Sequence, residues 1–135
     1  MKNGLIEHVN GDKIWYQNDQ LHRLDGPAIE RTSGSKVWYQ NGQLHRLDGP
    51  AAEWVDGDKV WWQNGQLHRL DGPVVEYSNG DKAWFQNDKL HRLDGPAVEY
   101  ADGDKVWYFL GIQAKSEEEF YDENWRKECL LKSIK

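Results

Sequence analysis

The sequence repeats with a period of 23 residues, and this period restricts the fold more than any other feature. Histidine, tryptophan, glutamate, lysine and the dipeptide Gly-Pro all recur at this interval. A unit of this length cannot bury an apolar face by itself, so neighbouring units must stack against one another. The period therefore predicts an array in which each unit is one small supersecondary structure.

Each unit is predicted to be a β-hairpin. The segment 36–40, KVWYQ, is short and rich in β-branched and aromatic residues, as strands are. An Asn-Gly pair at 41–42 signals a tight turn, and Asp-Gly-Pro at 48–50 excludes helix. PAVEY at 96–100 is typical of the second strand. We therefore expect an all-β fold: a single-layer antiparallel ribbon of β-hairpins with a C-terminal capping α-helix.

The period also divides the chain, which its length predicts to be a single domain, 1–135. Residues 1–12 match the second half of a unit, and four full units occupy 13–104. A partial unit follows at 105–115, where the polar pattern is lost. Residues 116–135 are predicted to form a helix that covers the last open edge of the sheet.

The helix prediction rests on its first turn and on its apolar spacing. Ser116 with Glu119 forms a capping-box pattern, and three glutamates in the first turn suit the helix dipole. Tyr121, Trp125 and Cys129 are spaced to share one stripe. Phe120, Leu131 and Ile134 form a second stripe, which could serve as a partner-binding or dimer face. The candidate residues for such a helix contact are Phe120, Tyr121, Trp125, Leu131 and Ile134.

Composition excludes several classes of function. The net charge is −6, and no basic run could follow a nucleic-acid backbone. The single cysteine, Cys129, can form no internal disulfide, and no Cys/His zinc spacing is present. The sequence shows no apolar stretch long enough to span a membrane and no secretory pattern at its start. We expect a cytoplasmic protein without metal or cofactor.

The hexapeptide His-Arg-Leu-Asp-Gly-Pro occurs unchanged four times, and two interpretations are open. As a structural corner, Arg23 and Asp25 would pair, His22 would stack on an aromatic ring, and Leu21 and Leu24 would anchor the segment. As a binding strip, the pairs would form a cationic edge for phosphates, a nucleotide or an acidic surface. The candidate ligand-binding residues are His22, Arg23, His45, Arg46, His68, Arg69, His91 and Arg92.

The tryptophans form a second repeated feature. In an extended strand Trp38 points away from the side of Val37 and Tyr39. A single-layer sheet cannot bury both faces by itself, so we expect one aromatic row in the core. The other row would be open to a partner or covered by long polar side chains. The candidate aromatic-face residues are Trp15, Trp38, Trp61, Trp84 and Trp107.

This unit resembles the MORN repeat, which is also a 23-residue β-hairpin. The similarity rests on Trp38-Tyr39, Asn41-Gly42, His45 and the later Asp-Gly at 56–57, and it covers residues 5 to about 111. MORN units usually carry glycines after the histidine, whereas this chain has Arg-Leu-Asp-Gly-Pro. It looks closer to a variant repeat of small bacterial and bacteriophage proteins. That resemblance implies a phage-encoded modulator of a host defence factor.

We therefore expect a non-catalytic binding module. Motifs for a catalytic nucleophile, a phosphate-binding loop or a metal are absent from the sequence, and four equivalent catalytic sites would be unusual. The leading hypothesis is a protein–protein contact through the aromatic face or the terminal helix, which could also form a homo-oligomer. The alternatives are a nucleotide-type ligand on the His-Arg edge and a membrane-surface scaffold. The acidic charge opposes the scaffold.

Overall fold

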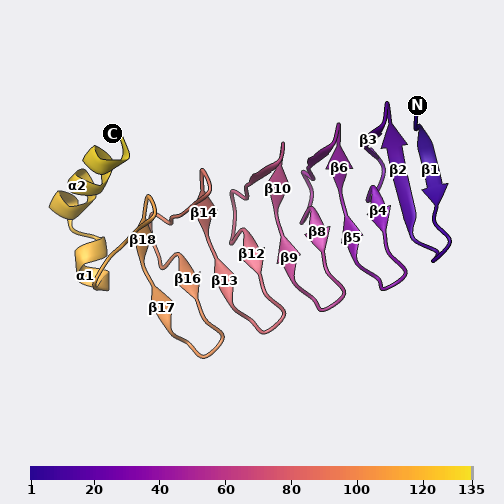
Figure 1. Cartoon of the computed structure of the whole chain (residues 1–135). Coiled ribbons are helices and arrows are strands. Elements are labelled where there is room, and N and C mark those ends of the chain that lie inside the picture. Colours follow the sequence, from indigo (N-terminus) through magenta and orange to yellow (C-terminus); the bar gives the residue numbers. More distant parts are fainter. Residues whose placement is uncertain (135) are drawn as a thin grey trace. The chain divides into compact units, whose positions relative to one another are not determined.

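The computed structural model describes residues 1–134. The chain forms two compact units, Met1–Arg69 and Leu70–Lys135, and we describe each by itself (Figure 1). Both are built from very short antiparallel strands that follow one another along the chain. Helix is confined, among the described residues, to the C-terminal end of the second unit.

The first unit contains a sheet in which every neighbouring pair is antiparallel. Its strands, in spatial order, are β1 (Gly4–Glu7), β2 (Lys13–Gln17), β4 (Ile29–Glu30), β5 (Lys36–Val37), β8 (Ala52–Glu53) and β9 (Lys59–Val60). In each pair a glutamate lies opposite a lysine and an apolar residue lies opposite another, as for Glu30↔Lys36 and Ile29↔Val37. The register therefore keeps apolar side chains on one side of the sheet.

The second unit repeats this arrangement. Its strands, in spatial order, are β12 (Val75–Glu76), β13 (Lys82–Ala83), β16 (Val98–Glu99) and β17 (Lys105–Val106). The pairs Glu76↔Lys82 and Lys82↔Glu99 show the same register as the first unit. The 23-residue period is thus a structural period as well.

Each repeat also contains a small hairpin beside the main sheet. These hairpins are β6 (Tyr39–Gln40) with β7 (Gln43–Leu44), β10 (Trp62–Gln63) with β11 (Gln66–Leu67), β14 (Phe85–Gln86) with β15 (Lys89–Leu90), and β18 (Tyr108–Phe109) with β19 (Ile112–Gln113). In the first repeat β3 (Gln20–Leu21) pairs directly with β2. Asn41 and Gly42 both have positive φ, 51° and 78°, as a type I′ turn requires. The predicted Asn-Gly turn is therefore correct.

The predicted strand 36–40 is divided at its tryptophan. The N–H of Trp38 donates to Ala51 O (2.7 Å), whereas its carbonyl accepts from His45 N (3.1 Å). His45 is the first residue of the His-Arg-Leu-Asp-Gly-Pro segment and Ala51 directly follows it, and the segment bends away between these two partners, so the pairing is interrupted. Trp15 stays within β2 because β1 lies along the other side of that strand and pairs Leu5 with Trp15.

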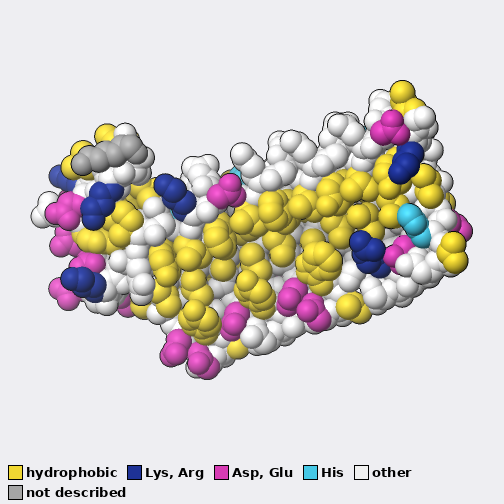
Figure 2. Space-filling model, viewed as in Figure 1, with side chains coloured by type: hydrophobic (Ala, Val, Ile, Leu, Met, Phe, Trp, Pro, Cys, Tyr) yellow, Lys and Arg dark blue, Asp and Glu magenta, His cyan; other side chains and the backbone are white. Residues whose placement is uncertain are grey.

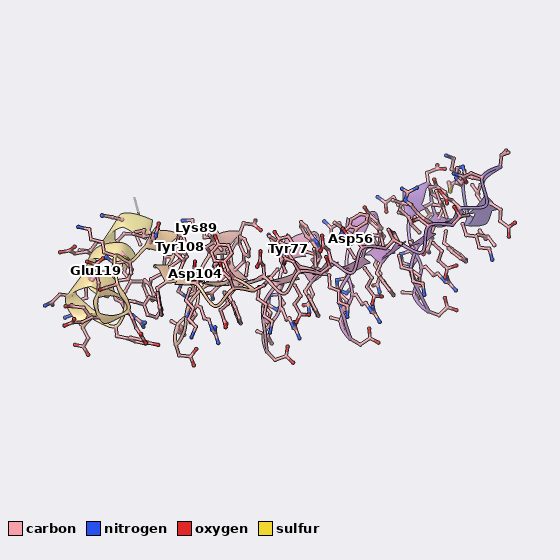
Figure 3. All side chains as sticks on the ribbon, turned by 90° about the horizontal axis from the view of Figure 1, so that it is seen from below. Asp56, Tyr77, Lys89, Asp104, Tyr108 and Glu119 are labelled. Atoms are coloured by element: carbon pink, nitrogen blue, oxygen red, sulfur yellow. The ribbon has the colours of Figure 1, made fainter. Side chains whose placement is uncertain are left out.

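The predicted fold class is confirmed. Seen edge-on in Figure 3, the ribbon of each unit is one sheet thick, and side chains project from both sides. The sheet pairs are all antiparallel, and the hairpins recur in both units. The fold is an all-β, single-layer hairpin repeat with helix at its C-terminal end.

The half repeat at the N-terminus closes the first hairpin with groups that the missing repeat would supply. Asp19 N donates to Lys2 O (3.0 Å), as Gly42 N donates to Leu21 O (2.9 Å) in the next repeat. Asn18 N donates to the side-chain oxygen of Asn3 (2.8 Å). In later repeats a histidine nitrogen accepts the equivalent bond.

The predicted C-terminal helix is two helices, α1 (Glu117–Phe120) and α2 (Glu123–Ser133). Ser116 caps α1 as predicted, with its side chain accepting from Glu119 N at 3.1 Å. The chain then leaves the helix at Tyr121, and Asp122 caps α2 by accepting from Asn124 N (2.7 Å) and Trp125 N (3.2 Å). Sequence spacing alone missed this second cap.

The break changes both predicted stripes. Tyr121 lies between the helices and is exposed, so only Trp125 and Cys129 of the first stripe share a helix. Of the second stripe, Phe120 is fully buried, whereas Leu131 and Ile134 are exposed. The helices instead close a small core. Its buried members are Phe109, Ala114, Phe120 and Cys129, and Trp107, Leu110, Ile112 and Trp125 pack around them.

Candidate binding faces

The first unit has one apolar face, and it forms a shallow groove. Its residues, which define the name apolar face below, are Ile29, Val37, Tyr39, Leu44, Ala52, Trp54, Val60 and Trp62, with Arg31 at one end. The strand register places these side chains together, because Ile29, Val37, Ala52 and Val60 are successive cross-strand partners. Figure 2 shows hydrophobic side chains gathered over β5, β8 and β9.

The floor and the rim of this groove differ in exposure. Val37 and Ala52 are buried, at 5% and 3% exposure, by the aromatic and aliphatic side chains beside them. Trp54 at the rim is 44% exposed. The described residues of this unit place no second sheet or helix over the groove. Large apolar side chains of this kind at a surface mark an interaction site more often than scattered ones do.

The second unit carries the same side-chain types at equivalent positions. Val75, Ala83, Val98 and Val106 are successive cross-strand partners. Tyr77 and Tyr100 occupy the position of Trp54 and are 47% and 45% exposed. Figure 3 labels Tyr77 and Tyr108, which the strand register assigns to this face. The apolar face is therefore a property of the repeat.

The opposite face is where the candidate tryptophans lie, and an arginine covers each of four. The guanidinium carbon of Arg23 is 3.8 Å from the centre of the Trp15 ring, and the same stack recurs along the chain. The other stacked pairs, at 3.8–3.9 Å, are Arg46 on Trp38, Arg69 on Trp61 and Arg92 on Trp84. This cation–π contact makes the tryptophan row a covered row, whereas Tyr39 and Trp62 of the other row line the open groove.

The arginine of each corner is held on every side. Arg46 donates through Nε to Asp48 (3.0 Å) and through Nη1 to Pro50 O (3.1 Å), and Nη1 lies 3.4 Å from Glu53. A Cβ at Gly49 would lie 2.8 Å from the Arg46 guanidinium carbon, so any larger residue there would displace the guanidinium. The guanidinium is sandwiched between the Trp38 ring and this glycine. The predicted Arg–Asp pair is present in this corner and in the first, where Arg23 meets Asp25 at 3.0 Å.

The histidines connect neighbouring repeats. Nδ1 of His22 accepts from Asn41 N (2.9 Å), and Nδ1 of His45 accepts from Asn64 N (3.0 Å). His91 makes the same bond with Leu110 N at 2.8 Å. An accepting Nδ1 requires a neutral imidazole with its proton on Nε2. Of the predicted histidine stacks, the described rings show His91 beside Phe109, with centroids 5.0 Å apart.

His91 differs from the other repeated histidines in its burial. It is 7% exposed, beneath the C-terminal helices. Burial lowers the pKa of His91 below its usual 6.5, and the nearby positive charge of Arg126 lowers it further. Both effects favour the neutral form that the hydrogen bond to Leu110 needs.

A carboxylate makes a similar connection at the opposite edge of the sheet. Asp12 accepts from Thr32 N (2.9 Å) and pairs with Arg31 at 3.1 Å, and Asp81 accepts from Ala101 N (2.7 Å). The hydrogen bond from the Thr32 amide is the largest cause that lowers the pKa of Asp12. In these two turns the residue after the glycine therefore joins one repeat to the next.

One detail of the predicted corner is wrong. Leu24 was expected to anchor the segment but is 76% exposed, because the backbone bends there and turns the side chain to solvent. The repeated glutamates lie opposite lysines in the sheet, but their ion pairs are with arginines. Glu30, Glu53 and Glu99 each meet the arginine of their own corner, at 3.5, 3.4 and 3.1 Å.

The junction between the last hairpin and the helices is filled. Arg126 donates to Phe120 O (2.8 Å) and to Leu93 O (2.7 Å), and its guanidinium lies over the Phe109 ring at 4.9 Å. Of the candidate contact residues on the helices, Phe120 and Trp125 point into this core. Leu131 and Ile134 remain exposed, together with Leu130, which is not among the predicted contact residues.

The alternation predicts one open aromatic row, but the candidate residues were the tryptophans and not the row of Val37 and Tyr39, which alternates with Trp38 in the same strand. The available signal was this alternation combined with Trp54, an aromatic residue next to a polar turn. The described residues contain no cluster of His, Cys, Asp or Glu able to hold a metal ion. They also contain no helix long and apolar enough to cross a membrane.

Comparison with protein-family models gives no match to this sequence, and comparison with curated proteins gives none either. The two faces described above are therefore the features from which a function can be inferred.

Proposed function

We propose that this chain is a non-catalytic protein-binding module and that it contacts its partner through the apolar face. The observation that carries this proposal is the groove of the first unit, whose aromatic rim includes the exposed Trp54. Aromatic side chains in a desolvated groove supply most of the energy of many protein interfaces. A sheet that is one layer thick has no second layer to cover its apolar side. The groove therefore loses its contact with water only when another molecule binds there.

The other candidate surfaces are supported less well. Arg23, Arg46 and Arg92 are already stacked on tryptophans and bonded to Pro27 O, Pro50 O and Pro96 O. A nucleotide on this edge would have to displace these contacts. The terminal helix offers three exposed apolar side chains, Leu130, Leu131 and Ile134, fewer than the eight apolar residues that line the groove. The resemblance to bacteriophage repeat proteins adds the expectation that the partner is a host factor.

The test is native mass spectrometry of the protein purified from its own cells. The informative variant is Trp54→Ser on the rim of the groove, and Lys59→Ser on the opposite face of the same unit is the matched control. Lys59 is exposed, so the free energy of unfolding of Lys59→Ser should stay within about 0.5 kcal/mol of the wild type. Trp54 is 44% exposed, so Trp54→Ser should lose about 1–3 kcal/mol of packing, and its melting curve must show that it is folded under the conditions of the test. We expect a stoichiometric protein partner with the wild type and with Lys59→Ser, and its loss with Trp54→Ser. Retention of the partner by Trp54→Ser would refute the apolar face as the contact.

A further inference from the structure

The sheet of the first unit has an open edge at β1. This strand pairs with β2, and no other described strand pairs with its outer side (Figure 1). The residues before β1 continue toward the turn at 18–19, where Lys2 O accepts from Asp19 N and the Asn3 side chain accepts from Asn18 N. They therefore do not fold back over the outer side of β1.

This edge carries unpaired backbone groups. The Trp15 amide, which lies opposite Leu5, donates to Ala28 O on the other side of β2, so the carbonyl of Leu5 points outward. His8 N donates to Asp12 O, so the preceding Glu7 directs its N–H and C=O outward, because ladder bonds alternate along an antiparallel strand. A row of unpaired backbone groups is a template for another strand.

The interior of the same unit shows which kind of strand fits this edge. Like β1, strands β4 and β8 place an apolar residue before a glutamate, and a lysine–aliphatic strand pairs with each on the side that is open in β1. These pairs are Lys13↔Glu30 with Ile14↔Ile29, and Lys36↔Glu53 with Val37↔Ala52. The same register on β1 would set a lysine opposite Glu7 and an aliphatic residue opposite Ile6.

Glu7 also lacks charged partners that the interior glutamates have. Glu53 lies opposite a lysine on each side, Lys36 and Lys59, and meets the arginine of its own corner at 3.4 Å. Glu7 is exposed, lies opposite one lysine, Lys13, and forms no ion pair with a described residue. A basic residue on the outer side of β1 would restore the interior arrangement.

We propose that the outer edge of β1 binds an extended segment of a partner protein in which a basic residue precedes valine or isoleucine. The segment adds one antiparallel strand, with the basic residue opposite Glu7 and the aliphatic residue opposite Ile6. The next amide of the segment donates to Leu5 O, as Trp38 N donates to Ala51 O at 2.7 Å. A second copy of β1 would not supply this strand, because its sequence, GLIE, contains no basic residue.

The probe is a labelled head-to-tail cyclic peptide with the sequence of residues 28–38, which presents Lys36 and Val37 as β5 presents them to β8. Cyclisation lowers the cost of ordering the peptide. One matched peptide carries glutamate in place of Lys36, and another carries an N-methyl group on the Trp38 amide. The Glu30 amide is N-methylated in every peptide, so that the peptides do not pair with one another.

Fluorescence anisotropy measures the affinity of each peptide for the full chain. We expect the lysine peptide to bind, and each matched peptide to bind at least about tenfold more weakly. Added salt should weaken the lysine complex, because exposed ion pairs are screened.

A charge exchange in the protein completes the test. Glu7 is exposed, so Glu7→Lys should keep the wild-type melting temperature. It should bind the glutamate peptide better than the lysine peptide, the reverse of the wild type. Trp54→Ser should bind the lysine peptide normally, since this edge is separate from the apolar face, so the two contacts fail independently.

Three results would overturn the proposal. The first is an unchanged preference in Glu7→Lys, and the second is a loss of peptide binding only in Trp54→Ser. The third is self-association of the wild-type chain on size-exclusion chromatography that Glu7→Lys abolishes, which would make a second copy the occupant of the edge.

Discussion

An interior corner and the last hairpin of the chain are packed differently, the first by polar side chains of its own and the next repeat, the second by the C-terminal helices. In the interior, Arg46 covers Trp38 and His45 bonds the following turn. In the last hairpin these positions are Lys115 and Ala114, so neither contact forms. Phe109 and Ile112 replace polar residues of the other hairpins, which are glutamine in all cases but Lys89, and pack with Phe120 instead. Polar groups that satisfy one another locally can be copied from repeat to repeat, whereas an apolar core ends the series.

The change from polar corners to an apolar core lowers stability at Trp107. Its indole Nε1 is buried and has no hydrogen-bond partner among the described residues. A buried donor without a partner costs about 1–3 kcal/mol. The apolar core around Phe120 must offset this cost as well as the loss of the arginine stack. The stability of the last hairpin should therefore depend on the helices more than the interior repeats do.

Removal of residues 116–135 is expected to have the largest effect. It exposes Phe109 and Ala114, which are 6% and 5% exposed, and uncovers the last edge of the array. We expect the truncated protein to aggregate on size-exclusion chromatography. Phe120→Ala should remain a monomer but lose about 3–5 kcal/mol, because a fully buried ring leaves a cavity. A truncated protein that stays monomeric with an unchanged melting temperature would show that the helices do not cap the array.

A paired substitution at the arginine position tests the difference between the two regions directly. Arg46→Ala should destabilise by about 2 kcal/mol, because it uncovers Trp38 and leaves Pro50 O without its donor. The exposed Asp48 should contribute little of this. Lys115→Ala, at the equivalent position of the last hairpin, should change stability by less than about 0.5 kcal/mol.

The measurement is a urea unfolding curve for each variant. Equal effects at the two positions would mean that the arginine stack does not stabilise the repeats. Arg46→Lys adds a control, since lysine keeps the charge but lacks the planar group that stacks on the ring.

The pH dependence of unfolding tests the histidine at the boundary between the two regions. The pKa of His91 is lowered in the folded protein by burial and by Arg126, so the unfolded chain binds a proton more readily. The contribution of His91 to stability is present above pH 6.5 and is lost as the pH falls through this value toward the folded pKa. The free energy of unfolding should therefore decrease over this range.

His91→Asn isolates that contribution. Asn3 shows that an asparagine oxygen can accept the equivalent amide bond at 2.8 Å, and asparagine does not titrate. We expect the variant to fold and to show a shallower decrease between about pH 8 and about pH 5, the range in which histidine titrates. An unchanged slope would mean that His91 has the same proton affinity in both states.

The parts of the fold that the sequence predicts are those set by neighbouring residues. The Asn-Gly pair predicts the turn at 41–42, and the close spacing of Arg46 and Asp48 predicts their ion pair. The stack of Arg46 on Trp38 joins residues in different segments of one repeat, and the bond from Asn64 to His45 joins two repeats. Such contacts depend on how segments that are distant in the sequence are placed in space. The pattern of residues that are adjacent in the sequence does not specify this placement.

The candidate binding faces are also predicted only as far as neighbouring residues determine them. Alternation predicts that Val37 and Tyr39 share a side, but it does not say which side stays open. That depends on Arg46, which stacks on Trp38 and so covers one side of the sheet. The opposite side stays open as the groove. The exposure of Leu47 depends on a bend in the backbone that Asp-Gly-Pro permits but does not impose.

The smallest expected effect concerns the turn of the last hairpin. Leu110 has a φ of 53°, a left-handed conformation that asparagine adopts at the equivalent Asn41 with a φ of 51°. A left-handed leucine costs about 1–2 kcal/mol, and asparagine tolerates this region better. Leu110 also packs against the core around Phe120, so its replacement loses some apolar burial. We expect Leu110→Asn to stabilise by about 0.5 kcal/mol, the difference between these two effects.

The matched substitution Asn41→Leu, made where no helix packs, should destabilise by about 1–2 kcal/mol. A loss of stability in Leu110→Asn would mean that the leucine at this turn serves the cap more than it strains the backbone. The last hairpin would then be tied to the helices through its turn as well as through Phe109.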